Sequence, residues 1–494
     1  MIRAGLRGAG VAAVVLVVLL LPAVAAAHPL GNFTINHFAG LHIAPDRVLV
    51  DLVIDRAEIP AFQERRRIDL DANGTIDAGE ADAARWAGCA ALVADLRLAV
   101  DGTPVPLAVV AAGISFPEGA GGLPTMRLVC ELEGALSGPL ARAARVEFED
   151  RSFAERIGWR EIVVVGNGVR VEGAPAGPIG AANRLTAYPA DLLAIPPEQR
   201  SISVAVTPAG IPGPAWRAPD AEAVAGGSAS PGKASSERPR DVGQELAALV
   251  DAEDLTPAAI LASLLAAIAL GIVHAVSPGH GKTIMAAYLV GGRGTTRQAL
   301  GLGMAVAASH TLGVVLLALI TIGAAGVLPP ERLYPVLGVV SGGLVVVIGT
   351  SLLWARARQL IGARQHARAH EAGHAHDHDH PHPADAGAIS WRGLVALGLS
   401  GGLLPSASAL ILLLGSIAAG RIAYGLVLVL GFGLGMALVL AGLGLIVLRA
   451  GRWLERAPAV RGLGRLVPQA QLGFAALVVV LGLVLTGQAV AQVL

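Results

Sequence analysis

The sequence predicts a multi-domain protein, in which an α-helical polytopic membrane domain follows a β-rich domain with an EF-hand-like helical insertion. At 494 residues and 54% hydrophobic, the chain is more apolar than ordinary soluble proteins of this length. The apolar content concentrates beyond residue 250, whereas residues 28–206 alternate apolar and polar positions between turn residues. Lys and Arg balance Asp and Glu at 37 each, so no charge bias indicates a nucleic-acid partner.

Residues 1–27 have the features of a secretory signal peptide. Arg3 and Arg7 precede an apolar run from Val11 to Leu21, and three alanines at 25–27 form a small-residue cleavage site. An uncleaved anchor helix is the alternative. Both interpretations place the next domain on the periplasmic side of a bacterial inner membrane.

Residues 28–206 are expected to form an antiparallel β domain such as a sandwich, interrupted by a helical insertion at about 57–95. The strand-like stretches are Arg47–Ile54, Leu96–Val100, Thr125–Leu132, Arg145–Phe148, Glu161–Val165 and Ser201–Val206. The two cysteines of the chain, Cys89 and Cys130, both fall in this exported region, where disulfides persist. A bridge between them and two unpaired thiols remain alternatives, because spacing fixes neither distance nor geometry.

The insertion contains an EF-hand-like loop over residues 69–80. Oxygen ligands at the required positions would come from Asp69, Asp71, Asn73, Thr75 (through its carbonyl), Asp77 and Glu80. Gly74 stands at the sharp turn of the loop. This spacing surrounds one hard cation with oxygen, so we expect a structural Ca²⁺ site; an acidic solvated turn is the alternative.

Two further segments of the exported region are its N-terminal histidines and its C-terminal end. His28, at the expected mature N-terminus, and His37 could hold a borderline metal together with the terminal amine, although surface or packing histidines are the alternative. Residues 207–250 are rich in Pro, Gly, Ala and Ser, and this composition is typical of a flexible linker.

Residues 251–494 are expected to form a six-span membrane domain. The predicted spans are about 256–277, 298–324, 334–354, 392–419, 423–448 and 469–493. Three of the connecting loops are rich in arginine, and the positive-inside rule places them in the cytoplasm. The middle one, residues 358–390, is rich in histidine.

The domain has the pattern of two inverted repeats with broken helices. Gly271–Pro278 aligns with Gly398–Pro405, each a Gly- and Pro-interrupted segment in the first span of its half. Matching interruptions of this kind indicate a transport site. Because the chain has 63 glycines, chance similarity is the alternative.

Histidines inside the apolar segments are the candidate transport path. His274 and His280 flank Pro278, and His310 lies within the second span. An ionisable side chain in a membrane segment usually faces a cavity or a partner, and imidazole suits nickel, cobalt and zinc. Helix packing is the alternative for each of them.

The His-rich cytoplasmic loop could chelate the same metals loosely. Its candidate ligands are His374, His376, His378, His380 and His382. Alternating His and Asp cannot form a core, and a low-complexity spacer is the alternative.

Taken together, these residues resemble the bacterial nickel/cobalt transporter (efflux) family of the NicO type. The resemblance covers about residues 255–494, and it is carried by His274–Thr283, Tyr288–Thr295, Ser309–Thr311, the His-rich loop and Ser400–Pro405. It implies a six-span secondary transporter for Ni²⁺ or Co²⁺, and the exported domain is similar to an N-terminal extension of some relatives. Relatives often carry a cysteine where Ser406 stands, so this chain favours imidazole and oxygen ligands over a thiolate.

The expected function is therefore secondary transport of Ni²⁺ or Co²⁺ across the inner membrane, without enzyme activity. Export is the direction that the resemblance implies, whereas the cytoplasmic histidines would suit collection of ions for export and buffering after uptake equally. The rival hypotheses are an exporter of a small anion and a membrane-anchored calcium-binding module. A thiol-redox carrier needs paired cysteines in the membrane, and residues 251–494 contain none.

Overall fold

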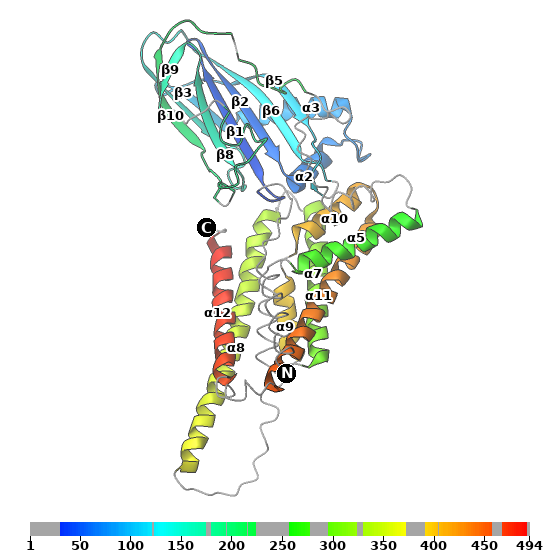
Figure 1. Cartoon of the computed structure of the whole chain (residues 1–494). Helices are drawn as coiled ribbons and strands as arrows, with labels where there is room; N and C mark the ends of the chain where they lie inside the picture. Colours follow the sequence, from blue (N-terminus) through cyan, green and yellow to red (C-terminus); the bar gives the residue numbers. More distant parts are fainter. Residues whose placement is uncertain are drawn as a thin grey trace, which may run out of the picture. The chain divides into compact units, whose positions relative to one another are not determined.

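The computed structural model describes most of two compact units, one formed mainly by Ala26–Ala247 and one mainly by Ala248–Leu494 (Figure 1). The described residues are 30–120, 123–173, 179–193, 195–214, 216–223, 256–276, 295–323, 330–371, 391–403, 405–456 and 467–491. The predicted signal peptide, with His28, lies outside them.

The first unit is a β-sandwich of two five-stranded sheets. One sheet has the order β5-β6-β2-β1-β8, with β1 (Ile35–Ile43), β2 (Arg47–Arg56), β5 (Ala108–Ser115), β6 (Met126–Ala135) and β8 (Arg160–Gly166). The other has the order β4-β3-β7-β10-β9, with β3 (Leu96–Val100), β4 (Thr103–Pro104), β7 (Ala144–Asp150), β9 (Val169–Glu172) and β10 (Ser201–Pro208). Leu41 and Leu52 from the first sheet and Phe148 and Val204 from the second share one buried core. The predicted β domain is therefore confirmed.

One strand pair departs from the antiparallel expectation. β1 and β8 run parallel, with His37 opposite Arg160 and Ile43 opposite Gly166. Because more than a hundred residues separate these strands in the chain, no local turn signal could announce their direction.

The outer face of the first sheet is also covered. Phe38, Val53 and Val129 on this face pack against Ala182 and Leu185 and against Ala218 and Ala221. The covering segment 216–223 belongs to the stretch expected to be a linker from residue 207. Its Pro-, Gly- and Ala-rich composition gave no indication that Ala218 and Ala221 pack on the sheet. Residues 224–250 lie outside the described part.

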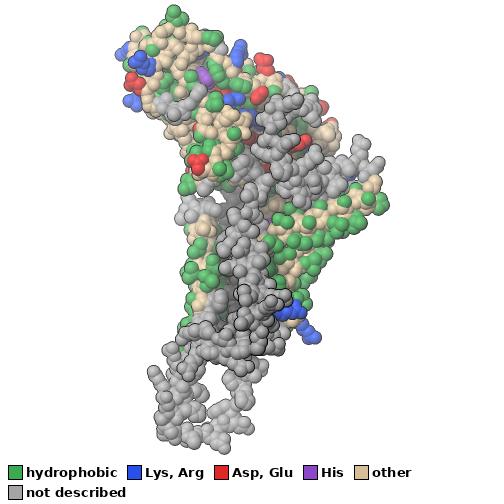
Figure 2. Space-filling model, viewed as in Figure 1, with side chains coloured by type: hydrophobic (Ala, Val, Ile, Leu, Met, Phe, Trp, Pro, Cys, Tyr) green, Lys and Arg blue, Asp and Glu red, His purple; other side chains and the backbone are tan. Residues whose placement is uncertain are grey.

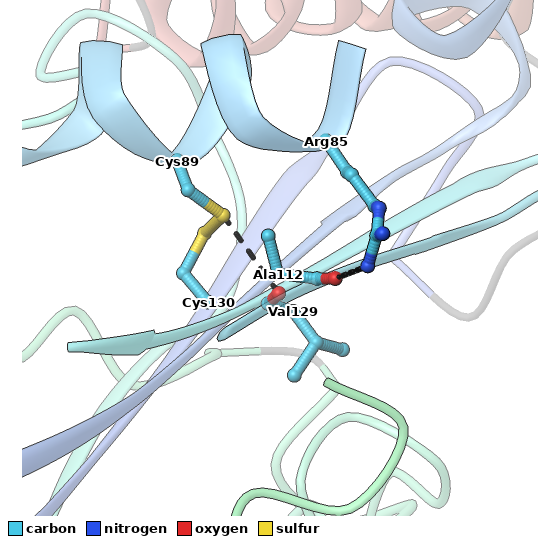
Figure 3. The surroundings of a disulfide bond; sticks show 5 residues. All are labelled: Arg85, Cys89, Ala112, Val129 and Cys130. Carbon is cyan, nitrogen blue, oxygen red and sulfur yellow. Dashed lines mark hydrogen bonds between the residues drawn. A yellow bond between two sulfur atoms is a disulfide. The ribbon is translucent and has the colours of Figure 1, made fainter. Parts of the chain in front are cut away.

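The helical insertion has the expected helix–loop–helix form. α2 (Glu58–Ile68) and α3 (Ala78–Val93) flank the EF-hand-like loop. A disulfide joins Cys89 of α3 to Cys130 of β6, and Arg85 donates a hydrogen bond to the carbonyl of Ala112 on β5 (Figure 3). Of the two alternatives for the cysteines, the structure has the bridge, and it fixes α3 on the sandwich.

The second unit is helical. It comprises α5 (Pro257–Val276), α7 (Thr296–Gly323), α8 (Pro330–Glu371), α9 (Trp391–Gly402), α10 (Ala407–Ala418), α11 (Ile422–Arg456) and α12 (Val467–Ala491). Within the described residues, four helical segments are long and apolar enough to cross a membrane: Pro257–Val276, Thr296–Gly323, Val336–Ala355 and Ile422–Ile446. Two shorter apolar helices, Ala407–Ala418 and Ala475–Val490, fall on the other two predicted spans.

The fourth predicted span, 392–419, is divided. α9 ends at Gly402 and α10 begins at Ala407, with Pro405 between them. Proline has no N–H to donate and disfavours the helical conformation of the residue before it, so it interrupts the ladder of hydrogen bonds here. α8, in contrast, continues to Glu371, so the first part of the predicted His-rich loop is helical.

Glycines allow these helices to approach closely. A Cβ atom at Gly271 of α5 would overlap the carbonyl oxygen of Phe432 on α11, and one at Gly402 of α9 would overlap the hydroxyl of Ser309 on α7. Small residues at helix crossings are typical of membrane proteins. Figure 2 shows hydrophobic side chains along much of the described surface of the helices, whereas most visible charged side chains lie on the β-rich unit.

Candidate metal site

Two of the predicted path histidines lie together in the helical unit. Gly271 brings α5 against Phe432 of α11, and His274 follows three residues later on the same side of α5. His310 lies in the middle of α7 and is buried, with 4% of its surface exposed. The centroids of the two imidazole rings are 5.5 Å apart.

Phe432 completes a cluster of three rings. Its centroid lies 5.5 Å from that of His274 and 6.0 Å from that of His310, and its plane is nearly parallel to the His310 ring. Phe432 is 1% exposed, so it gives the histidine pair an apolar wall from α11. Phe432 could not be recognised from the sequence, because a phenylalanine in an apolar helix carries no distinguishing signal.

The break between α9 and α10 also reaches this cluster. Ser406 caps α10: its hydroxyl accepts a hydrogen bond from the N–H of Ala409, and its carbonyl accepts one from Leu410. Nε2 of His310 accepts a hydrogen bond from the backbone N–H of Ser406 at 3.1 Å and lies 3.2 Å from the Ser406 hydroxyl. A residue 96 positions away in the chain thus orients His310.

Neighbouring hydrogen bonds hold the helices in this arrangement. The hydroxyl of Ser309, next to His310, donates to the carbonyl of Gly398 on α9 at 3.0 Å. The hydroxyl of Ser341 on α8 donates to the carbonyl of Ser400, which also lies on α9. These bonds fix the end of α9 against α7 and α8. The break is therefore held near His310 from the α9 side by these bonds and from the α10 side by Ser406.

The separation of the two rings suits a shared ion. Imidazole nitrogen binds zinc-like ions at about 2.0–2.1 Å, so two rings on one ion have centroids about 4.5–6 Å apart at ordinary ligand angles. Nickel and cobalt accept imidazole equally well. In the described part of the chain, no third His, Cys or carboxylate joins this pair within metal-ligand distance, so water or a residue outside that part would complete the coordination.

Other predicted site residues fall into two groups. His280 and His374, His376, His378, His380 and His382 lie outside the described residues. His37 lies between the two sheets, where its Nδ1 is 2.8 Å from Asp150 of β7. Burial lowers the pKa of His37, although the hydrogen bond to Asp150 opposes the shift. This position favours a hydrogen-bonding role inside the sandwich over a surface metal site with His28.

The EF-hand-like loop brings its acidic ligands together. Oxygen atoms of Asp69, Asp71 and Glu80 lie within 4.8 Å of one another. Gly74, with a φ of +86°, makes the left-handed turn that a side chain would strain, and its N–H donates to Asp69 at 2.8 Å.

The remaining loop ligands are used differently. The side chain of Asp77 caps α3 by accepting from the N–H of Glu80, and Asn73 accepts from the N–H of Thr75 at 2.7 Å. The donor set of carboxylate, amide and carbonyl oxygens is hard and anionic, and therefore fits calcium better than a transition metal.

The fold and the paired histidines beside a broken helix define a helical, multi-pass membrane protein with a β-rich N-terminal region. The NicO family model, described as high-affinity nickel-transport protein, matches residues 260–390, which include His274 and His310. A protein of Methanocaldococcus jannaschii, MJ1092, provisionally named a nickel/cobalt efflux system, is 31% identical over 179 residues, or 36% of this chain and 72% of that relative. The nickel/cobalt efflux system RcnA of Salmonella typhimurium is 32% identical over 222 residues, or 36% of this chain and 76% of that relative.

The chain therefore belongs to the NicO family of nickel/cobalt transporters. No solved structure matches it.

Proposed function

We propose that this protein is a secondary transporter that exports Ni²⁺ or Co²⁺ across the bacterial inner membrane. The observation that carries the proposal is the pair of His274 and His310, which lie 5.5 Å apart between helices of an apolar unit. The names of the relatives MJ1092 and RcnA support both the metals and the outward direction.

The chemistry of the pair suits passage rather than storage. An ion entering an apolar unit must exchange water for fixed ligands, and imidazole is a borderline ligand that nickel and cobalt prefer. Two neutral imidazoles leave the charge of the ion uncompensated, so they bind it less tightly than anionic thiolates would. Transport requires binding that is strong enough for entry and weak enough for release.

The helix pairing supports two related halves. α5, the first helix of one half, packs against α11 of the other, and α9, the first helix of the second half, packs against α7. A two-fold relation between inverted repeats would exchange these two pairs. The transport site would then lie where the interrupted segment of one half meets the second helix of the other, as Ser406 meets His310.

Metal content of cells tests the direction. Cells that express the protein should hold less nickel and cobalt than cells that express the His310→Ala variant at the same level in the membrane. Thr350→Ala is a matched control, because Thr350 is exposed on α8 and, among the described residues, its hydroxyl bonds within its own helix to the carbonyl of Val346. Higher metal content in cells with the wild-type protein than in cells with the variant would indicate uptake instead of export. Equal metal content in the two would refute metal transport.

We further propose that the loop at 69–80 holds one structural Ca²⁺ in the periplasm. The convergence of Asp69, Asp71 and Glu80 supports the site, and extracellular sites of this kind bind with Kd on the order of 10⁻⁴–10⁻³ M. Calorimetry on the β-rich unit, which has its own core, should detect this binding in wild type and in Glu118→Gln, an exposed control. Equal binding by Glu80→Gln would refute the site.

The disulfide supports a periplasmic location for the β-rich unit, because such bonds persist in oxidising compartments. Sequencing of the mature N-terminus tests the proposed cleavage before His28. The rival hypotheses of a small-anion exporter and of an anchored calcium-binding module receive no support from the relatives.

A further inference from the structure

Ser406 donates a hydrogen bond to Nε2 of His310 and so occupies the lone pair that a metal ion would need. Its backbone N–H donates to Nε2 at 3.1 Å, and its hydroxyl lies 3.2 Å from the same atom. The hydroxyl already accepts from the N–H of Ala409, which leaves its own proton to donate to Nε2. Both residues are more than nine-tenths buried, so water does not compete freely for these contacts.

This contact fixes the state of the ring. An N–H donor requires a lone pair on Nε2, so the proton of neutral His310 resides on Nδ1. A metal at Nε2 must displace the Ser406 N–H. A metal at Nδ1 requires the proton to move to Nε2, which then cannot accept from Ser406. Whichever nitrogen binds the ion, the hydrogen bond from the backbone N–H of Ser406 to His310 has to open.

We propose that Ser406 is a positioning residue that competes with the transported ion for His310, so that ion capture releases the start of α10 and ion departure restores the contact. This inference rests on the proposed function of the His274–His310 pair. Opening exchanges the two Ser406 donors for one metal–nitrogen bond, and the ion loses one water molecule, which can accept the freed N–H. No covalent bond changes.

The surrounding bonds direct the movement to one side of the break. Ser309 ties α9 to α7 through the carbonyl of Gly398, and Ser341 ties α8 to α9 through the carbonyl of Ser400. Neither bond involves the imidazole of His310. The end of α9 therefore stays in place when His310 takes an ion, whereas the start of α10 loses a partner. The occupancy of the metal site is thus coupled to the α9–α10 junction.

Transport kinetics in proteoliposomes test the competition. Ser406→Ala keeps the backbone donor and removes the hydroxyl donor, so nickel should be captured more easily. A hydrogen bond of ordinary net strength corresponds to a decrease in the apparent KM for Ni²⁺ on the order of fivefold. Ser406→Thr keeps both donors and should return the apparent KM to that of the wild type. If Ser406 only caps α10, Ser406→Ala would lower the maximal rate with an unchanged or higher KM, and that result would overturn the inference.

A second measurement reports on the ring itself. Nitrogen NMR of histidine-labelled protein, with the signals assigned by comparison with His310→Gln, should show the Nδ1–H form of His310 without metal. Diamagnetic Zn²⁺ is then added as the probe in place of Ni²⁺. The Nε2 signal should shift while Nδ1 stays protonated if the ion binds Nε2, and the ring should change to the Nε2–H form if the ion binds Nδ1. An Nε2–H form without metal would contradict the contact. If His310→Ala transports nickel normally, the proposed function itself fails; if that variant is inactive but Ser406→Ala leaves KM unchanged, only the Ser406 inference fails.

Discussion

Gly271→Ala should impair transport although it touches neither histidine. The Cβ atom of an alanine at this position would overlap the carbonyl oxygen of Phe432 and lie 2.9 Å from its carbonyl carbon and 3.1 Å from its Cα. These are backbone atoms, so no side-chain rotation can relieve the contact, and ordinary van der Waals contact begins at 3.4 Å. α5 must therefore move away from α11, and His274 moves with it.

The expected cost follows from two opposing terms. Replacing glycine by alanine inside a helix favours folding by up to about 1 kcal/mol. Overpacking at a tight contact typically costs about 1–3 kcal/mol, and the backbone position of the clash places Gly271 at the upper end. We therefore expect net destabilisation of about 1–2 kcal/mol, together with a higher apparent KM for Ni²⁺ because the two rings no longer stand 5.5 Å apart.

Gly442→Ala is the matched control. Gly442 also lies in a helix of this unit, α11, but a Cβ atom there would meet none of the described residues within 4 Å. This variant should transport nickel like the wild type and be as stable or slightly more stable in thermal unfolding followed in detergent. Equal stability and equal KM for Gly271→Ala and Gly442→Ala would refute the role assigned to the α5–α11 crossing.

Three further outcomes are expected. Replacing both Cys89 and Cys130 by alanine should destabilise the β-rich unit in urea unfolding by about 4 kcal/mol, because the bridge closes a loop with a sequence separation of 41 residues. An unchanged free energy of unfolding would contradict a stabilising bridge. Burial raises the pKa of Asp55 to about 7 despite the nearby Arg127, so the stability that protonated Asp55 contributes is present below about pH 4 and is lost as the pH rises through 7. In Asp55→Asn, the fall in the free energy of unfolding between these pH values should be smaller by up to about 4 kcal/mol. A pH profile of stability parallel to that of the wild type would contradict the raised pKa. Deletion of 372–382 leaves α8 intact and should change the apparent affinity for nickel without abolishing flux.

The local features of the fold were predictable because local rules determine them. The alternation in β2 and the turn residues around it indicated a strand, and Asp69 to Glu80 indicated a helix–loop–helix, as the structure has it. Pro405 indicated an interrupted helix for the same reason, since the missing N–H acts on its immediate neighbours.

Contacts between distant segments were not predictable in the same way. Asp51 and Asp55 alternate with apolar residues and indicate a solvent-facing side of β2, yet Arg184 covers Asp51 with two hydrogen bonds. Within the candidate site, the spacing around Pro278 indicated that His274 lies near His280, which is outside the described residues, and gave no sign that His274 lies beside His310. A contact between residues 36 positions apart depends on how α5 and α7 both pack against α11, and no spacing in the sequence records that.

Flux through purified protein tests whether His274 and His310 lie on the transport path. Proteoliposomes containing the wild-type protein or the Thr350→Ala control should move Ni²⁺ and Co²⁺ at similar rates, measured with radioactive tracers at equal protein incorporation. Loss of outer partners of metal ligands alone typically costs 10–100-fold, so the His274→Ala, His310→Ala double variant should lose at least about tenfold in flux. A double variant that is folded and moves both ions as fast as the wild type would contradict the assignment of this histidine pair to the transport path.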